Sequence, residues 1–181
     1  MKYKFLFIFS LFGLGLFAQD EESYSLEFGL TASTLSGTET SINKIGLTAG
    51  GTYSWFVNPL FGGEVGLKFI QKGAFDPPDR DIGSNHFYKL TQYYLQIPFS
   101  VLYYKKGFTY GLGLSAGYLI SFKEENQNGI FPASEPFRKI EISALASVKF
   151  DLNNRIKFNV GFNQSIIPVK LYPSGGVWYN I

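Results

Sequence analysis

One property constrains the fold of this chain more than any other, namely a period of two in its apolar side chains. In the segment GFTYGLGLSAGYLISF, residues 107–122, apolar residues occupy one parity, and Gly, Ser and Thr occupy most of the other. Successive side chains of a β-strand point to opposite faces, so this alternation predicts a strand. The second face lacks the charged residues that usually meet water, which indicates that it looks into a narrow space.

Six other segments show the same alternation, and two kinds of connection separate them. These segments are residues 24–32, 44–56, 61–73, 93–104, 139–150 and 155–166. The short links, which are rich in turn-forming residues, lie at 57–60, 105–107 and 152–155. The longer polar segments lie at 33–43, 74–86, 123–138 and 168–177. Short turns at one end of a sheet and long loops at the other are typical of an outer-membrane barrel.

The composition favours a membrane barrel over a soluble sheet. The chain of 181 residues has the length of one domain and no cysteine, and only 17% of its residues are charged, against about 25% in ordinary soluble domains. A soluble sandwich or a lipocalin-like barrel would carry charges at the outward positions of most strands, and these positions are apolar here. Lipid cannot hydrogen-bond a free strand edge, so a sheet that spans a membrane must close.

We therefore expect an all-β fold, a small closed antiparallel transmembrane β-barrel of about eight strands. Aromatic residues near the strand ends should form girdles at the membrane surfaces. The candidate girdle residues are Tyr53, Trp55, Phe61, Tyr103, Phe108 and Phe122.

The N-terminal residues have the pattern of an export signal. Two lysines precede an apolar run over residues 5–17, and Ala18 follows it. We expect residues 1–18 to be a cleaved signal peptide and residues 19–181 to be the barrel domain. An uncleaved anchor is the alternative, but the run is shorter than the ~20 residues of a spanning helix. The formal charge of +2 comes from the two leader lysines, so no nucleic-acid partner is expected.

Charged side chains share the parity that points into the barrel. They are Glu27, Glu64, Glu141, Lys44, Lys68, Lys72, Lys149, Arg155 and Lys157. The interior of an eight-stranded barrel has room only for side chains, and an unpaired ion there is costly. We expect a structural polar network in which these charges pair with one another or with Gln92, Gln96 and Asn159. A gated pore for small solutes is the alternative, but the two signs are mixed and form no single-sign ring.

The sequence offers few residues for catalysis or cofactor binding. His86, the only histidine, lies in a long loop near Ser84 and Asp81. Some lipid enzymes on small barrels use a His and a Ser near the rim, so a rim-located lipid-modifying enzyme is a second alternative. No recognisable nucleophile context accompanies His86, and we expect no catalytic residue. The Gly-rich run 111–117 lies in mid-strand without a following helix, so we expect no cofactor.

Acidic residues in the predicted loops could bind a cation at the surface. They are Asp76, Asp79, Asp81, Glu124 and Glu125. Solvated charges are the simpler interpretation of such residues, and we expect no metal site.

The strand over residues 93–104 and its hairpin partner resemble a known family. Tyr93, Leu95, Ile97 and Pro98 form an aromatic-x-Leu-x-Ile-Pro pattern, and a Gly-rich strand over residues 111–118 follows. With the leader ending in FAQ, this region resembles the PorT-like outer-membrane β-barrel proteins of the Bacteroidota. The resemblance implies an outer-membrane barrel. The name-giving member is linked to protein secretion across the outer membrane and to gliding, and most relatives have no assigned activity.

Together these features predict a non-enzymatic outer-membrane protein. We expect it to be a structural or accessory component of an envelope complex, such as a secretion or motility machine. Its expected partners are outer-membrane lipid and that complex. The alternatives are a narrow small-solute channel and the rim-located lipid enzyme.

The last residues of the sequence are too few for a membrane crossing. Residues 178–181 follow the last polar segment, whereas a crossing strand needs ~9 to 11 residues. We expect the eighth strand to be incomplete by roughly 8 to 12 residues. The alternative is a poorly closed seam between the first and seventh strands.

Overall fold

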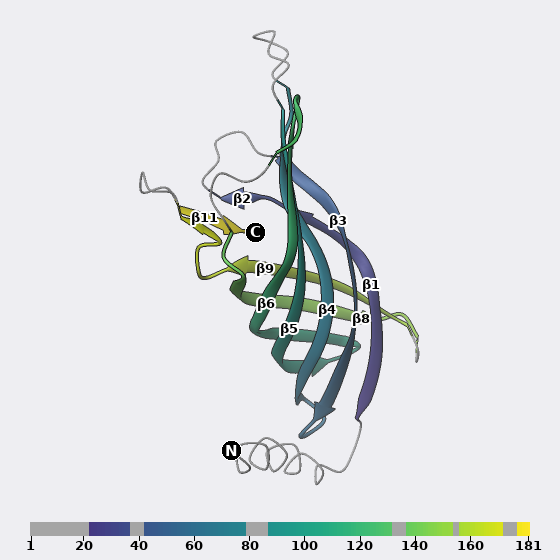
Figure 1. The fold of residues 1–181 in the computed structure, drawn as a ribbon. Helices are drawn as coiled ribbons and strands as arrows, with labels where there is room; N and C mark the ends of the chain where they lie inside the picture. The colour runs from purple at the N-terminus through teal and green to yellow at the C-terminus, as the bar shows by residue number, and fades with distance from the viewer. Residues whose placement is uncertain (1–21, 37–41, 79–86, 132–136, 154–155, 172–176) are drawn as a thin grey trace, which may run out of the picture.

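Two antiparallel sheets make up the structure, a computed structural model (Figure 1). The structure describes residues 22–36, 42–78, 87–131, 137–153, 156–171 and 177–181. The main sheet has the strand order β1-β3-β4-β5-β6-β8-β9, and β7 pairs with the end of β6. These strands are β1 (Ser23–Ser33), β3 (Ile42–Phe56), β4 (Phe61–Asp76), β5 (Tyr88–Lys105), β6 (Phe108–Asn126), β7 (Gly129–Phe131), β8 (Ile140–Asp151) and β9 (Lys157–Ser165). The second sheet joins β10 (Lys170–Leu171), β11 (Val177–Asn180) and β2 (Leu35–Ser36).

Some of the predicted features lie outside the described residues. They are the signal peptide over residues 1–18 and the side chains of Asp79, Asp81, Ser84, His86 and Arg155. Within the described ranges, the structure has no helix with the length and apolar character needed to cross a membrane.

The seven long strands confirm the segments that the alternation predicted. Short turns join β3 to β4, β5 to β6 and β8 to β9 at one end of the sheet, which we call the turn end. The opposite end is called the loop end. In the β5–β6 turn, Lys106 and Gly107 both have positive φ, at 51° and 81°. A two-residue turn of this kind matches the right-handed twist of the strands, so it fixes their register.

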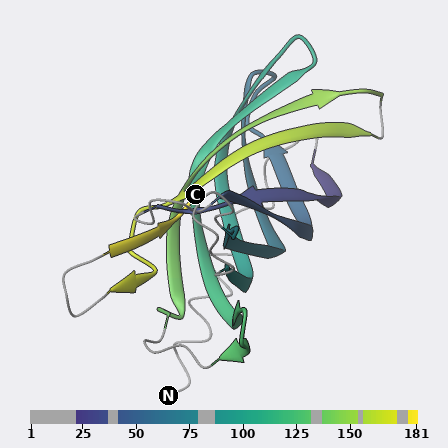
Figure 2. The same cartoon turned by 90° about the horizontal axis from the view of Figure 1, so that it is seen from above.

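The main sheet curls into a half-barrel (Figure 2). Its edges are β1 and β9, which do not pair with each other in the described part of the chain. At the loop end, β11 pairs with β10 on one side and with β2 on the other. Thr34 and Ile181 exchange two backbone hydrogen bonds of 3.1 Å beside this contact. The predicted all-β antiparallel fold class is therefore confirmed, but among the described residues strand pairing bridges the two edges only at the loop end.

The two faces of the curled sheet differ in chemistry. On the outer face, apolar side chains are exposed, such as Leu26 at 80% and Leu112 at 69%. On the inner face, polar side chains are buried, such as Gln96 at 1% and Ser115 at 3%. This is the reverse of a soluble protein, in which apolar side chains are buried and polar ones face solvent.

Aromatic rings line the outer face near the turn end. Ring contacts join Tyr24 to Tyr53, Tyr53 to Trp55 and Trp55 to Phe99, and they join Phe61 to Tyr103, Tyr103 to Tyr110, Tyr110 to Phe108 and Phe108 to Phe150. The centroid distances lie between 5.0 Å, for Tyr24 and Tyr53, and 6.4 Å, for Trp55 and Phe99. Five of the six predicted girdle residues belong to these contacts.

A β-bulge in β6 reverses the parity near the loop end. The register with β5 shifts at Ile120, which has no partner there. Beyond the bulge, Phe122 pairs with Gln92, a fully buried residue of the inner face. The ring of Phe122 contacts that of Phe137 at a centroid distance of 5.0 Å. The prediction that Phe122 belongs to the outer girdle is therefore wrong.

A small apolar core fills the inside of the loop end. Its buried residues are Leu35, Ala74, Leu90, Tyr94, Leu119, Phe137 and Val169. Phe137 and Val169 come from segments that the sequence predicted to be loops, and these segments also contain β7 and β10. The predicted loops thus contribute packing to the barrel as well as surface.

Candidate functional site: the charged lumen

Four inner-face charges near the turn end, together with Ser54, form a cluster that we call the turn-end cluster. The charged residues are Glu27, Glu64, Lys68 and Lys149. Lys149 Nζ lies 3.3 Å from Glu27 Oε1 and also pairs with the Glu64 carboxylate. Lys68 pairs with Glu27, and Ser54 Oγ donates a hydrogen bond of 2.9 Å to Glu64. The two lysines balance the two carboxylates.

A second group, the loop-end cluster, surrounds the fully buried Glu141. Its Oε1 accepts hydrogen bonds from Lys72 Nζ at 2.7 Å, Ser143 Oγ at 2.9 Å and Ser165 Oγ at 2.5 Å. Its Oε2 accepts one from Asn180 Nδ2 at 3.3 Å. A buried carboxylate is tolerated when its charge is paired and its oxygens are hydrogen-bonded, and Glu141 meets both conditions.

The loop-end cluster also connects β11 to the rest of the barrel. Asn180 of β11 donates to Glu141 and, at 3.4 Å, to the hydroxyl of Tyr94 on β5. Lys72 donates to Asn163 Oδ1 at 3.0 Å and lies 5.5 Å from the centre of the Tyr94 ring. Side chains from β4, β5, β8, β9 and β11 therefore meet in one network.

Both clusters connect strands that are not neighbours in the sheet. Lys149 on β8 reaches Glu64 on β4, and Lys72 on β4 reaches Glu141 on β8. Strands β5 and β6 lie between β4 and β8. The contacts therefore cross the lumen between β4 and β8.

Of the charges that the sequence predicted for the network, the structure places Glu27, Glu64, Lys68 and Lys149 in the turn-end cluster and Lys72 and Glu141 in the loop-end cluster. Gln92 and Gln96 are buried on the inner face, where Gln92 pairs with Lys72 and Gln96 with Lys68 in the β4–β5 register. Among the described residues, however, the amide oxygen and nitrogen of Gln92 and the amide nitrogen of Gln96 have no hydrogen-bond partner.

Other predicted lumen residues lie apart from both clusters. Lys157 is 45% exposed and pairs with Asp151 at 3.4 Å near the turn end. Asn159 is exposed on the edge strand β9, and Lys44 is buried near the loop end. Lys157 and Asn159 are open to the surroundings because β9 has no neighbouring strand on one side in the described sheet.

Sequence reasoning missed a third buried ion pair, between Glu124 and Lys170. The side chains of Glu124 and Lys170 are almost fully buried, and Lys170 Nζ lies 3.4 Å from Glu124 Oε1. The same ammonium lies 4.6 Å from the centre of the Phe137 ring. The interpretation of Glu124 as a solvated loop charge is wrong, because β6 continues to Asn126 and the bulge turns Glu124 inward. A strict alternation cannot reveal this pair, since the bulge changes the parity.

The described part of the chain contains no group of three or more His, Asp and Glu residues that could hold a metal ion. Glu124 and Glu125, which the sequence presented as neighbouring loop carboxylates, point to opposite faces and pair with different lysines.

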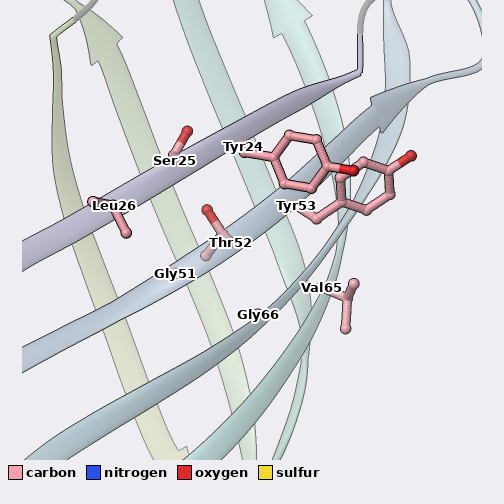
Figure 3. A pocket seen from close by; sticks show the side chains of 8 residues that line it. All are labelled: Tyr24, Ser25, Leu26, Gly51, Thr52, Tyr53, Val65 and Gly66. Atoms are coloured by element: carbon pink, nitrogen blue, oxygen red, sulfur yellow. The ribbon is translucent and has the colours of Figure 1, made fainter.

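A shallow hollow of about 320 Å³ lies on the outer face over β1, β3 and β4 (Figure 3). Its lining residues are Tyr24, Ser25, Leu26, Gly51, Thr52, Tyr53, Val65 and Gly66. Gly51 has no side chain and so leaves a gap between Leu26 and Val65, beside the paired rings of Tyr24 and Tyr53. The lining has no charged side chain, so the hollow offers no ionic contact to a polar substrate.

An apolar outer face, aromatic rows near the strand ends and an ion-paired interior define a transmembrane β-barrel protein. The chain belongs to the outer membrane protein beta-barrel domain family, whose family model matches residues 17–170. In this class the short turns lie in the periplasm, so the turn end is periplasmic and the loop end is external. No curated protein and no solved structure is significantly similar to the chain.

Proposed function

We propose that this outer-membrane barrel is non-enzymatic and non-conducting, and that it serves as a structural or accessory component of an envelope complex. The observation that carries the proposal is the pair of contacts that cross the lumen, Lys149 with Glu64 and Lys72 with Glu141. The interior of a small barrel is only wide enough for side chains, so contacts that cross it oppose a continuous water path. The protein would then act through the surfaces of the barrel and not through its lumen.

Apolar side chains at both ends of the lumen support the same interpretation. The loop end is filled by the apolar core around Tyr94 and Phe137. At the turn end, Leu102 is 2% exposed, and the rings of Phe56 and Tyr104 meet edge to face at 6.4 Å. Ions crossing the lumen would therefore have to leave water at each end.

The more specific assignment of export and of a cellular role rests on the resemblance of residues 93–118 to PorT-like proteins of the Bacteroidota. We propose on this basis that the protein is exported by a cleaved signal peptide, residues 1–18, and takes part in secretion or motility at the cell envelope. The loop-end parts of β4, β5 and β6 continue beyond the ring pair of Phe69 and Tyr93, so they offer an external surface to a partner.

Conductance in planar bilayers tests the closed lumen. The reconstituted protein should give no stable current steps. A variant with both Lys72→Ala and Lys149→Ala removes the two cations that cross the lumen and should conduct more than the native protein. Regular current steps from the native protein would favour the channel and contradict the proposal.

Site-specific photo-crosslinking tests the participation in a complex. A photoreactive residue at Ile130, exposed on β7 at the loop end, should crosslink to one abundant envelope protein in cells. The same residue at Leu112, on the apolar outer face, should react with lipid. If both positions give only lipid adducts in cells that secrete and move normally, the accessory role is contradicted.

A further inference from the structure

Accessible basic side chains gather at the external end of the barrel, on the outer face of β5 and β6 and just before β8. They are Lys89, Lys123, Arg138 and Lys139, and we call this set the basic rim. All four side chains are accessible, with Lys89 at 43% and Lys123 at 46% exposure. The lumen clusters do not include any of them, so the rim is a separate feature of the molecule.

The register places the two lysines of the basic rim on β5 and β6 directly beyond the lipid-facing belt. Tyr93, whose ring stacks on Phe69 at 5.8 Å, marks the external limit of the belt on β5. The next outer-face residues along β5 pair with Lys123 and Glu125 of β6. With a rise of about 3.3 Å per residue, Lys123 lies roughly 7 Å and Lys89 roughly 13 Å beyond Tyr93. The headgroup region of a bilayer extends about 5 to 8 Å beyond the hydrocarbon, and lysine stems can bend toward it.

The backbone holds the other two basic residues in the same region. The carbonyl of Lys139 accepts a hydrogen bond of 2.7 Å from Leu119 N on β6. Arg138 N donates one of 2.9 Å to the carbonyl of Val169. The backbone of Lys139 is therefore fixed beside the bulge of β6 and that of Arg138 beside Val169, and both side chains are exposed at this end of the barrel.

The acidic residues of this region do not cancel its positive charge. Glu125 lies between the two lysines, 3.3 Å from Lys89 and in contact with Lys123, and their hydrogen bonds hold its pKa below the usual value. Each ammonium has three donors and so keeps some free for another anion. Asp76 lies at the end of β4, on the strand next to β5.

We propose that the basic rim binds the phosphate groups of a phosphorylated glycolipid in the outer leaflet. Lysines supply point charges and Arg138 supplies a planar fork, which are the groups that recognise phosphate. The apolar belt below the rim contacts the acyl chains of the same lipid. This inference does not depend on the proposed accessory function, because it concerns the outer wall and not the lumen or the external partner.

Lipid titration of the full chain in detergent tests the proposal. The probes are bisphosphorylated lipid A and the same lipid after enzymatic removal of its phosphates, with bound lipid counted by native mass spectrometry. The native protein should prefer the phosphorylated form. A variant with Lys123→Gln and Arg138→Gln should bind it about tenfold more weakly, since two exposed charge contacts are lost.

A matched control removes the same charge at the other end of the barrel. Lys105→Gln with Lys106→Gln changes two exposed lysines at the periplasmic turn and should alter binding less than about twofold. Equal losses in the two variants, or equal affinity for both lipid forms, would overturn the proposal. Displacement of the lipid by inorganic phosphate at constant ionic strength would assign the rim to free phosphate and would also overturn it. A native-like shift between unheated and heated gel bands shows that each variant is folded.

Discussion

Lys149 on β8 contacts Glu64 on β4 across the lumen, although β5 and β6 separate these strands in the sheet. The contact exists only because the sheet curls, so this ion pair depends on the barrel shape itself. Lys149 also reaches Glu27 on β1, which brings a third strand into the same contact. The turn-end cluster thus stabilises the curvature in addition to satisfying its own charges.

Replacing Lys149 with Met should lower the free energy of unfolding by roughly 3 to 5 kcal/mol. The reason is that Glu27 and Glu64 would share the single remaining cation of Lys68 inside the lumen. Unfolding in detergent by heat or denaturant measures the loss. Lys157→Met is the matched control, since Lys157 is 45% exposed and its pair with Asp151 should contribute less than about 1 kcal/mol. Similar losses for the two variants would contradict the buried role of Lys149.

Glu141→Gln should destabilise the loop end, because it leaves the Lys72 ammonium, 5% exposed, without its carboxylate. We expect a loss of roughly 3 to 5 kcal/mol. Adding Lys72→Met to this variant should recover part of the stability, since no unpaired charge then remains. A double-mutant cycle measures the coupling, which should exceed about 0.5 kcal/mol. Strict additivity of the two substitutions would show that the residues do not act as a pair.

Leu114→Arg tests which face meets lipid. Leu114 lies on the outer face, near the middle of the part of β6 between the two aromatic ends, and is 53% exposed. A charge there should cost roughly 2 to 4 kcal/mol and reduce the amount of folded barrel in outer membranes. Leu152→Arg, in the β8–β9 turn beyond the belt, introduces the same side chain and should be tolerated. Normal assembly of both variants would mean that the outer face is not in the bilayer.

Gly117→Val tests the packing of the inner face. A β-carbon at Gly117 would lie 3.1 Å from Cγ of Gln96 and 3.4 Å from Cδ1 of Tyr94, so a larger side chain must displace buried neighbours. We expect a loss of roughly 1 to 3 kcal/mol in unfolding experiments. Gly161→Val is the control on β9, where the nearest atoms to an added β-carbon are 3.7 and 3.9 Å away. A loose, water-filled lumen would accept both substitutions equally.

The native protein should also change its gel mobility on heating. Membrane barrels often resist detergent until heated, because their hydrogen-bond ladder has few free edges. Folded protein extracted from outer membranes should therefore run at different positions before and after boiling. Recovery of the folded protein from the soluble periplasm without detergent would contradict the membrane assignment.

Local patterns were sufficient to predict the seven long strands, because a period of two needs no knowledge of the partner strand. The same parity placed Glu27, Glu64 and Glu141 inside. It did not place Glu124 or Phe122, since one extra residue at Ile120 reverses the faces beyond it. Such a bulge depends on the fit between β5 and β6 and leaves no mark in the alternation.

Other parts of the structure depend on contacts between distant segments. Strands β2, β10 and β11 have two to four residues each, too few for a readable pattern, and they exist because β11 fits between the other two. The sequence also did not predict which groups the charged side chains of the lumen contact. Gln92 and Gln96 point inward as expected, but the charges reach one another directly and do not use these amides.

The gap between β1 and β9 has a defined direction. Six successive antiparallel pairings connect these two edges, so β1 and β9 run the same way. If the two edges met directly, they would form a parallel ladder, which the rest of the sheet does not contain. An odd number of strands in the gap keeps every pairing antiparallel. β11, which is antiparallel to both β10 and β2, already has the direction that such a strand requires.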